Sequence, residues 1–134
     1  MDTLSFDRQL GDVIWMMVTG LRAGFSLLEV LEVLSKETPE PSRSAFKQLF
    51  MDLQNGMGYE PAFANLQKTI PSRLLDEILE AIKNNENWGG GMLAELLDPV
   101  GEKIVQEVGS DPTVYEAMRT LAWQVGARVP DRAK

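Results

Sequence analysis

The chain alternates between runs of apolar residues at helical spacing and short breaks that contain Gly, Pro or Ser. Within the runs, apolar side chains recur every three or four residues, which places them on one face of a helix. The runs are rich in Leu, Met, Ala, Glu, Lys and Gln, which favour helix, and the apolar–polar alternation typical of strands is nearly absent. The pattern therefore predicts a chain made almost entirely of helices.

The breaks divide the chain into seven predicted helices. They are expected at about Phe6–Ala23, after Ser26, after Ser42, at about Glu60–Lys68, after Ser72, at about Met92–Val108 and after Asp111-Pro112. Because connections of a few residues favour antiparallel neighbours, we predict an all-α fold, a compact helical bundle of about six to seven antiparallel helices joined by short Gly and Pro turns. Residues 1–108 are expected to form the bundle domain, and residues 109–134 a C-terminal helix and a flexible tail.

Serine residues at the breaks predict how several helices begin. Ser26 followed three residues later by Glu29 is the pattern of a capping box, in which each residue satisfies the other's backbone N–H. Ser42 and Ser72 are expected to cap the helices that follow them.

Glycines directly after apolar stripes predict how helices end. Gly24, Gly56 and Gly90 stand where a helix often ends on a residue with positive φ, so we expect at least one of them to adopt it. Gly91 completes a triple glycine with Gly89 and Gly90. That triplet lacks the spacing and the Lys of a phosphate-binding loop, so it is better explained as a turn between two close helices.

The first predicted helix is apolar around much of its circumference. Such a helix is either central in a bundle or buried against a partner. Trp15 and Met16 flank its main stripe, and they are either core residues or contacts for a partner, since Trp is enriched at binding hot spots. Trp88, beside the triple glycine, and Glu86, which precedes it, are the other candidate partner contacts.

The expected core is made of the apolar residues that fall on one stripe of each helix. These are Val13, Ile14, Met17, Leu21, Leu31, Leu34, Phe46, Leu49, Phe50, Phe63, Leu75, Ile78, Leu79, Ile82, Leu93 and Leu96.

Composition narrows the function. With 134 residues, 44% of them hydrophobic and 25% charged, the chain resembles an ordinary globular domain. It has no Cys and no His, which excludes disulfides, thiol catalysis, the Ser-His-Asp triad and most transition-metal sites. The net charge of −7 disfavours nucleic acid as a partner.

Acidic pairs such as Asp76 and Glu80 are best explained as solvated helix faces, because basic residues are interleaved with them. The longest uncharged apolar stretch, Val13–Leu21, is shorter than the about 20 residues of a membrane span. We expect no cofactor, no metal site and no enzymatic activity.

Four short motifs follow one another along the chain. They are Gln9-Leu10-Gly11-Asp12 with Leu21-Arg22-Ala23-Gly24-Phe25-Ser26-Leu27, then Leu53-Gln54-Asn55-Gly56 with Ala62-Phe63, then Ile70-Pro71-Ser72 with Leu74-Leu75, and last Gly90-Gly91-Met92-Leu93-Ala94-Glu95-Leu96-Leu97. In this order they resemble the cytoplasmic domain of type II secretion F-family proteins, with the platform proteins of Tad-type pilus systems as the closest branch. The resemblance spans about Gln9–Val105. Where that family usually has Glu-Thr-Gly-Gly, this chain has Glu86-Asn87-Trp88-Gly89-Gly90.

The resemblance implies a non-enzymatic helical bundle at the inner face of the bacterial cytoplasmic membrane. It implies protein partners, namely the assembly ATPase and other inner-membrane platform subunits, and contact with the membrane only through segments absent from this chain. The motif residues with structural roles are then Gly24, Ser26, Gly56, Gly90 and Gly91. The resemblance leaves open whether the chain forms a homo-oligomer. Two alternatives to the platform remain: a freestanding soluble helical adaptor, and a small Mg-dependent enzyme that uses Asp and Glu.

Overall fold

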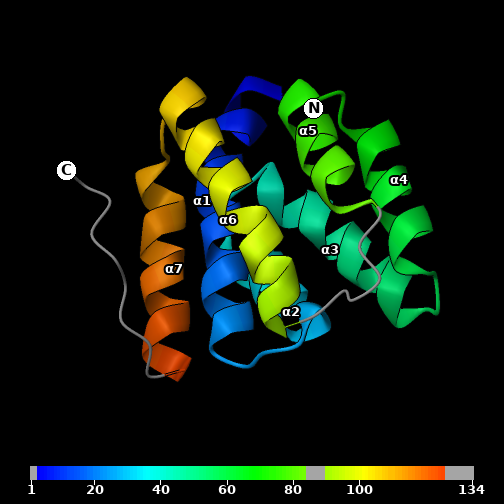
Figure 1. Cartoon of the computed structure of the whole chain (residues 1–134), viewed down its shortest axis with the longest axis horizontal. Coiled ribbons are helices and arrows are strands. Elements are labelled where there is room, and N and C mark those ends of the chain that lie inside the picture. Colours follow the sequence, from blue (N-terminus) through cyan, green and yellow to red (C-terminus); the bar gives the residue numbers. More distant parts are fainter. Residues whose placement is uncertain (1–2, 84–89, 126–134) are drawn as a thin grey trace.

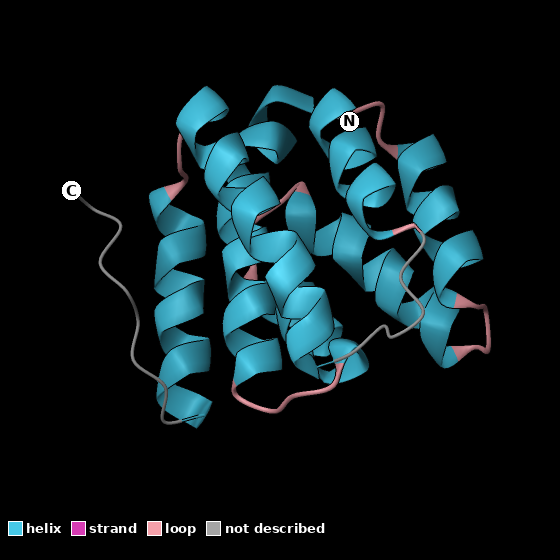
Figure 2. Ribbon diagram, viewed as in Figure 1, coloured by secondary structure: helices cyan, strands magenta, loops and turns pink. Residues whose placement is uncertain are grey.

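The computed structural model describes residues 3–83 and 90–125, and these residues form seven helices and no strand (Figures 1 and 2). The helices are α1 (Thr3–Arg22), α2 (Leu27–Glu37), α3 (Ser42–Gln54), α4 (Tyr59–Thr69), α5 (Arg73–Ile82), α6 (Gly90–Val108) and α7 (Pro112–Val125). Each lies where a helix is predicted from the sequence. The prediction of an all-α bundle is therefore confirmed.

Helix α1 is the centre of the bundle. It packs against α6, α7 and α2, and it also reaches α3 and α5. Every residue from Gln9 to Val18 is buried. Of the two explanations for an all-round apolar helix, the central position is the one observed.

Helices α1 and α6 run antiparallel and approach each other closely at two glycines. A Cβ atom built at Gly11 would lie 2.5 Å from Val105 Cγ2 and 3.2 Å from the Val105 backbone nitrogen. A Cβ atom built at Gly101 would lie 2.9 Å from Ile14 Cγ2. Only glycine, which has no side chain, leaves room for this crossing. Gly11 and Gly101 therefore set the distance between the two helices.

The core is one cluster that contains most of the predicted apolar positions. Leu96 is a correction, because it is 37% exposed and its neighbour Leu97 is buried instead. The side of α6 that packs inward carries Leu93, Leu97 and Ile104, four or seven residues apart, and Leu96 lies beside this stripe. Phe50 and Leu79 pack against the core while only partly buried.

Local chemistry at the helix ends agrees with most of the predicted caps. The Ser26 hydroxyl accepts the N–H of Glu29 at 3.1 Å, and the Glu29 carboxylate accepts the N–H of Ser26 at 2.9 Å, so the capping box is confirmed. Ser72 caps α5 by accepting the N–H of Leu75 at 3.1 Å. Gly24 has a φ of 100° and Gly56 a φ of 95°, which confirms the expected positive φ.

Helix α7 is attached to α1 through its first residues. Val114 is fully buried, and the side chain of Asp111, just before the helix, accepts the N–H of Thr113 at 2.9 Å. The division of the chain at residue 108 stays a prediction. No helix among the described residues has the length and apolar character needed to cross a membrane.

Gly11→Ala is expected to lower the free energy of unfolding. Alanine gains up to about 1 kcal/mol in helix propensity, but forcing a methyl group into a filled crossing costs about 1–3 kcal/mol. The cost should shrink by at least about 0.5 kcal/mol in a Val105→Ala background, because the nearest clashing atom is then absent. Urea denaturation of the four proteins of this double-mutant cycle measures both values. If Gly11→Ala costs the same in the two backgrounds, the helices cross less closely than these distances indicate.

Acid is expected to weaken the cap of α2. The Ser26 backbone N–H, and after it the Ser26 hydroxyl, hold the pKa of Glu29 below its usual value. A carboxylate with a lowered pKa in the folded chain contributes stability above its ordinary pKa of about 4.3, and this contribution is lost as the pH falls through the lower folded value. Unfolding measured from about pH 6 down to pH 3 should therefore show a shallower decline for Glu29→Gln than for the wild type. Glu37→Gln, at an exposed glutamate of the same helix, is the matched control and should leave the decline unchanged.

Candidate docking surface and the contacts that position it

A buried glutamine joins three parts of the bundle. Gln9 of α1 is 3% exposed, and its side-chain oxygen accepts both the backbone N–H of Ser42 at 3.2 Å and the Ser42 hydroxyl. Its side-chain nitrogen donates to the carbonyl of Glu40 at 2.9 Å and to Asp111 Oδ2 at 3.3 Å. The start of α3 and the start of α7 are therefore both held against α1 by one side chain.

Ser42 does not act as the predicted cap. It lies in the first turn of α3, and Pro41 occupies the position before the helix without a side-chain hydrogen bond to it. The Ser42 hydroxyl is turned inward to Gln9 instead. The prediction was wrong because a serine near a helix start can bond to any nearby acceptor, and here the acceptor comes from another helix.

Asp12 holds the same region from the next turn of α1. It is 1% exposed, and its Oδ2 accepts the backbone N–H of Asp111 at 2.8 Å. Buried polar groups need such partners, because an unsatisfied one costs about 1–3 kcal/mol. The sequence signal for these residues is a Gln and an Asp three positions apart inside an apolar run, and composition alone did not single them out.

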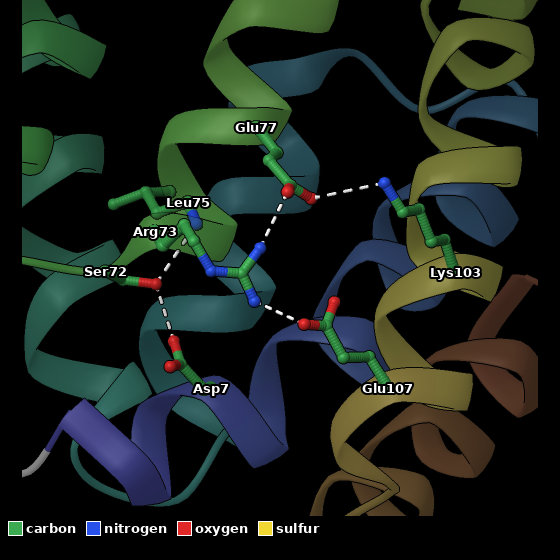
Figure 3. Close-up of polar contacts among 7 residues, drawn as sticks. All are labelled: Asp7, Ser72, Arg73, Leu75, Glu77, Lys103 and Glu107. Atoms are coloured by element: carbon green, nitrogen blue, oxygen red, sulfur yellow. Dashed lines mark hydrogen bonds and ion pairs between the residues drawn. The ribbon is translucent and has the colours of Figure 1, made fainter.

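A second set of polar contacts fixes α5 relative to α1 and α6 (Figure 3). The Ser72 hydroxyl, which caps α5, also donates to Asp7 of α1. Arg73 pairs with Glu77 on its own helix at 2.8 Å and with Glu107 of α6. Lys103 of α6 lies 3.8 Å from Glu77.

The Arg73 cluster positions helices more than it stabilises them. The hydrogen bond that Arg73 donates to Glu107, and the charge of that carboxylate, raise the pKa of Arg73, so the guanidinium is charged at any relevant pH. The Arg73 side chain is 64% exposed, and exposed ion pairs contribute little each. The cluster nevertheless gives α5 a defined orientation on α6, which leaves its opposite face turned toward α4.

Helices α4 and α5 form an antiparallel pair at one edge of the bundle (Figure 1). A groove lies between them. Its volume is about 340 Å³. Each helix contributes residues at positions i, i+3, i+4 and i+7, which are one face of a helix. They are Glu60, Phe63, Ala64 and Gln67 of α4, and Asp76, Leu79 and Glu80 of α5 together with Lys83, the residue directly after it.

The groove has an apolar floor and an acidic rim. Phe63 and Leu79 belong to or pack against the core, so they form the floor. Three carboxylates line the rim, and one of them, Glu80, is paired with Lys83 at 2.8 Å. Asp76 accepts a hydrogen bond from the amide of Gln67 at 2.7 Å. The rim therefore carries more negative than positive charge.

A second groove of about 340 Å³ lies between α3 and α4, and its chemistry differs. Its carboxylate, Asp52, accepts from the amides of Gln48 at 2.9 Å and Asn65 at 3.0 Å. Of the other polar groups of this groove, Thr69 donates to the carbonyl of Asn65, and the Ser44 hydroxyl donates to Glu40 outside it. Among the described residues, no group of three or more acidic side chains is arranged to hold a metal ion.

The predicted partner contacts fall in two places. Trp15 is 7% exposed and Met16 is fully buried, so both belong to the core and neither side chain is offered at the surface. The two are core residues because α1 is surrounded by other helices on most sides. Trp88 and Glu86 lie outside the described residues. An exposed tryptophan that was not proposed as a contact is Trp123 of α7, with 86% of its surface accessible.

The motif glycines and serine lie at or next to helix ends, although Gly90 and Gly91 belong to the first turn of α6 and not to the turn expected there. Gly24 and Gly56 end helices with positive φ, and Ser26 begins α2. Gly90 is the first residue of α6, and Gly91 follows it in the first turn.

Comparison with protein families gives one match. The family model described as type II secretion system (T2SS), protein F, matches residues 14–118, which extend from the middle of α1 into α7. Comparisons with curated proteins and with solved structures gave no significant match.

Gln9→Ala is expected to destabilise the chain strongly. It leaves the N–H and hydroxyl of Ser42 and the carbonyl of Glu40 without this partner, and several unsatisfied groups together should cost about 3 kcal/mol. Gln48→Ala is the matched control, since Gln48 is exposed and bonds only to Asp52 on its own helix; its effect should stay within about 0.5 kcal/mol. Thermal and urea unfolding measure both. Equal, small effects of the two substitutions on the free energy of unfolding would mean that the hydrogen bonds of Gln9 do not stabilise the packing of the helices.

Proposed function

The chain belongs to the type II secretion system protein F family, and on that premise we propose that it is the cytoplasmic platform domain of a Tad-type pilus assembly machine that docks the assembly ATPase. The observation that carries the proposal is the family match, which covers residues 14–118 of the 134 in the chain. The Tad-type branch is supported by the order of the four motifs along the sequence.

Members of this family are non-enzymatic components of the assembly platform of secretion and pilus machines. The prediction that the chain is not an enzyme is therefore confirmed, and the magnesium-dependent alternative is set aside. The motif residues Gln9, Asp12 and Ser26 hold helices in place, because they accept hydrogen bonds from the backbone N–H groups of Ser42, Asp111 and Glu29.

We propose a location at the inner face of the bacterial cytoplasmic membrane, with the ATPase and other inner-membrane platform subunits as protein partners. Trp88 and Glu86 remain the proposed contacts from the sequence. They follow Lys83, which lines the α4–α5 groove, by five and three positions. Only a few residues of the sequence therefore separate these two proposed contacts from a residue that lines the groove.

The test is direct binding of the purified chain to the cognate assembly ATPase by isothermal titration calorimetry. Trp88→Ala is expected to weaken binding at least about tenfold, the loss typical of a hot-spot tryptophan. Trp123→Ala is the matched control, since it removes another tryptophan that is highly exposed on α7, and it should leave affinity unchanged.

Three results would count against parts of this proposal. If the wild-type chain binds neither the ATPase nor another platform subunit, the freestanding adaptor becomes the better explanation. If the ATPase binds and both tryptophan variants bind as the wild type does, the platform role stands and Trp88 is not a contact. A larger loss for Trp123→Ala would move the interface to α7.

A further inference from the structure

We propose that the α4–α5 groove is the binding site for an amphipathic helix from a partner protein, with Lys or Arg at positions i and i+7 and apolar residues between them. The choice of a protein as occupant rests on the proposed platform function. The argument for the groove itself rests on its shape, its floor and its charge.

The shape of the groove suits the binding of a helix. Both walls present the i, i+3, i+4, i+7 face that one helix offers another in a bundle, and between α4 and α5 these faces line an open groove instead of meeting closely. Each wall extends from position i to position i+7, and these seven steps are about 10 Å of helix at a rise of about 1.5 Å per residue. A helix laid in such a groove with its apolar side down is a recurring mode of protein recognition.

The charges specify the occupant. Among the described residues, neither Glu60 nor Asp76 has an ion pair, whereas Glu80 is paired with Lys83. Glu60 begins the α4 wall and Gln67, which donates to Asp76, ends it. The two unneutralised carboxylates therefore lie near opposite ends of the groove, about 10 Å apart along α4. Cations at i and i+7 of a helix have the same separation.

The same charges argue against other occupants. An anionic membrane surface or a nucleic acid would be repelled by the rim. A second copy of this chain also carries a charge of −7, so self-association through this face is disfavoured. A basic segment of another protein is the occupant that the groove attracts.

The first probe is a synthetic Ala-rich peptide of about 16 residues, long enough to form helix, with Leu on one face and Lys seven positions apart beside it. The comparison peptide has Glu in place of each Lys. Titration into the labelled chain, followed by amide NMR shifts, is expected to show changes along α4 and α5 with the Lys peptide and none with the Glu peptide. Raising the salt concentration should weaken the binding, because exposed charges are screened.

The decisive variants are two matched pairs. Glu60→Gln with Asp76→Asn removes the two rim carboxylates that have no ion pair among the described residues, and Glu37→Gln with Asp52→Asn is the control pair on α2 and α3. Each pair removes one Glu and one Asp, and each Asp accepts a hydrogen bond from a glutamine amide, that of Gln67 or Gln48. The rim pair should weaken Lys-peptide binding by about fivefold, and the control pair by less than about twofold. Circular dichroism checks that all variants stay folded.

The groove is not the binding site if the NMR shift changes map to other helices, or if the two pairs of variants weaken Lys-peptide binding equally. The assembly ATPase is the second probe, and it separates this inference from the proposed function. If the ATPase fails to bind the wild type while the Lys peptide behaves as expected, the groove stands and the ATPase is not the partner. If the ATPase binds the rim variant as tightly as the wild type, it docks on another face and the groove is not its binding site.

Discussion

The close crossing of α1 and α6 at Gly11 and Gly101 is the constraint on which the rest of the bundle depends. Because no side chain separates the two backbones there, the relative position of these helices is set by contact between main chains and by Val105 and Ile14. The rest of α1 then has to serve as the inner wall for α2, α3 and α7 at once. That demand explains why ten consecutive residues, Gln9–Val18, are buried and why the helix is apolar almost all round.

Two polar residues inside this apolar helix fix the positions of the neighbouring helices relative to it. Apolar contacts tolerate small shifts of one helix along another, but a buried hydrogen bond does not, because a misplaced polar group loses its partner. Gln9 and Asp12 therefore fix where α3 and α7 begin, while Ser72 and Asp7 do the same for α5. All four residues of Gln9-Leu10-Gly11-Asp12 take part in this packing: Gln9 bonds to Ser42 and Asp111, Leu10 is in the core, Gly11 lies against α6, and Asp12 bonds to Asp111.

The parts of the fold that depend on neighbours in sequence could be predicted, and the parts that depend on neighbours in space could not. The capping box of Ser26, the cap of Ser72 and the positive φ of Gly24 follow from a few adjacent residues, and each is observed. The choice between Leu96 and Leu97 depends on how α6 is rotated against α1. The role of Ser42 depends on a glutamine 33 residues away. Trp15 illustrates the same limit for the candidate site: a helix that is apolar all round is compatible with a partner or with a core, and only the placement of the other helices decides.

The α4–α5 groove was missed for a related reason. The sequence predicts a solvated face for Asp76 and Glu80, and both are exposed. What the sequence alone does not display is that the i, i+4 pair on α5 faces Glu60 and Gln67 across a groove with Phe63 at its floor. The short connection at Ile70–Ser72 makes the two helices antiparallel, and Arg73 ties α5 to α6 on its other side. With α5 held toward α6 and α4 held by α3, the two facing stripes are kept apart, and an acidic, apolar-floored space stays open between them. Because the chain has a net charge of −7 and the floor of this groove is apolar, an additional basic helix bound here would extend the packing pattern that the described helices already follow.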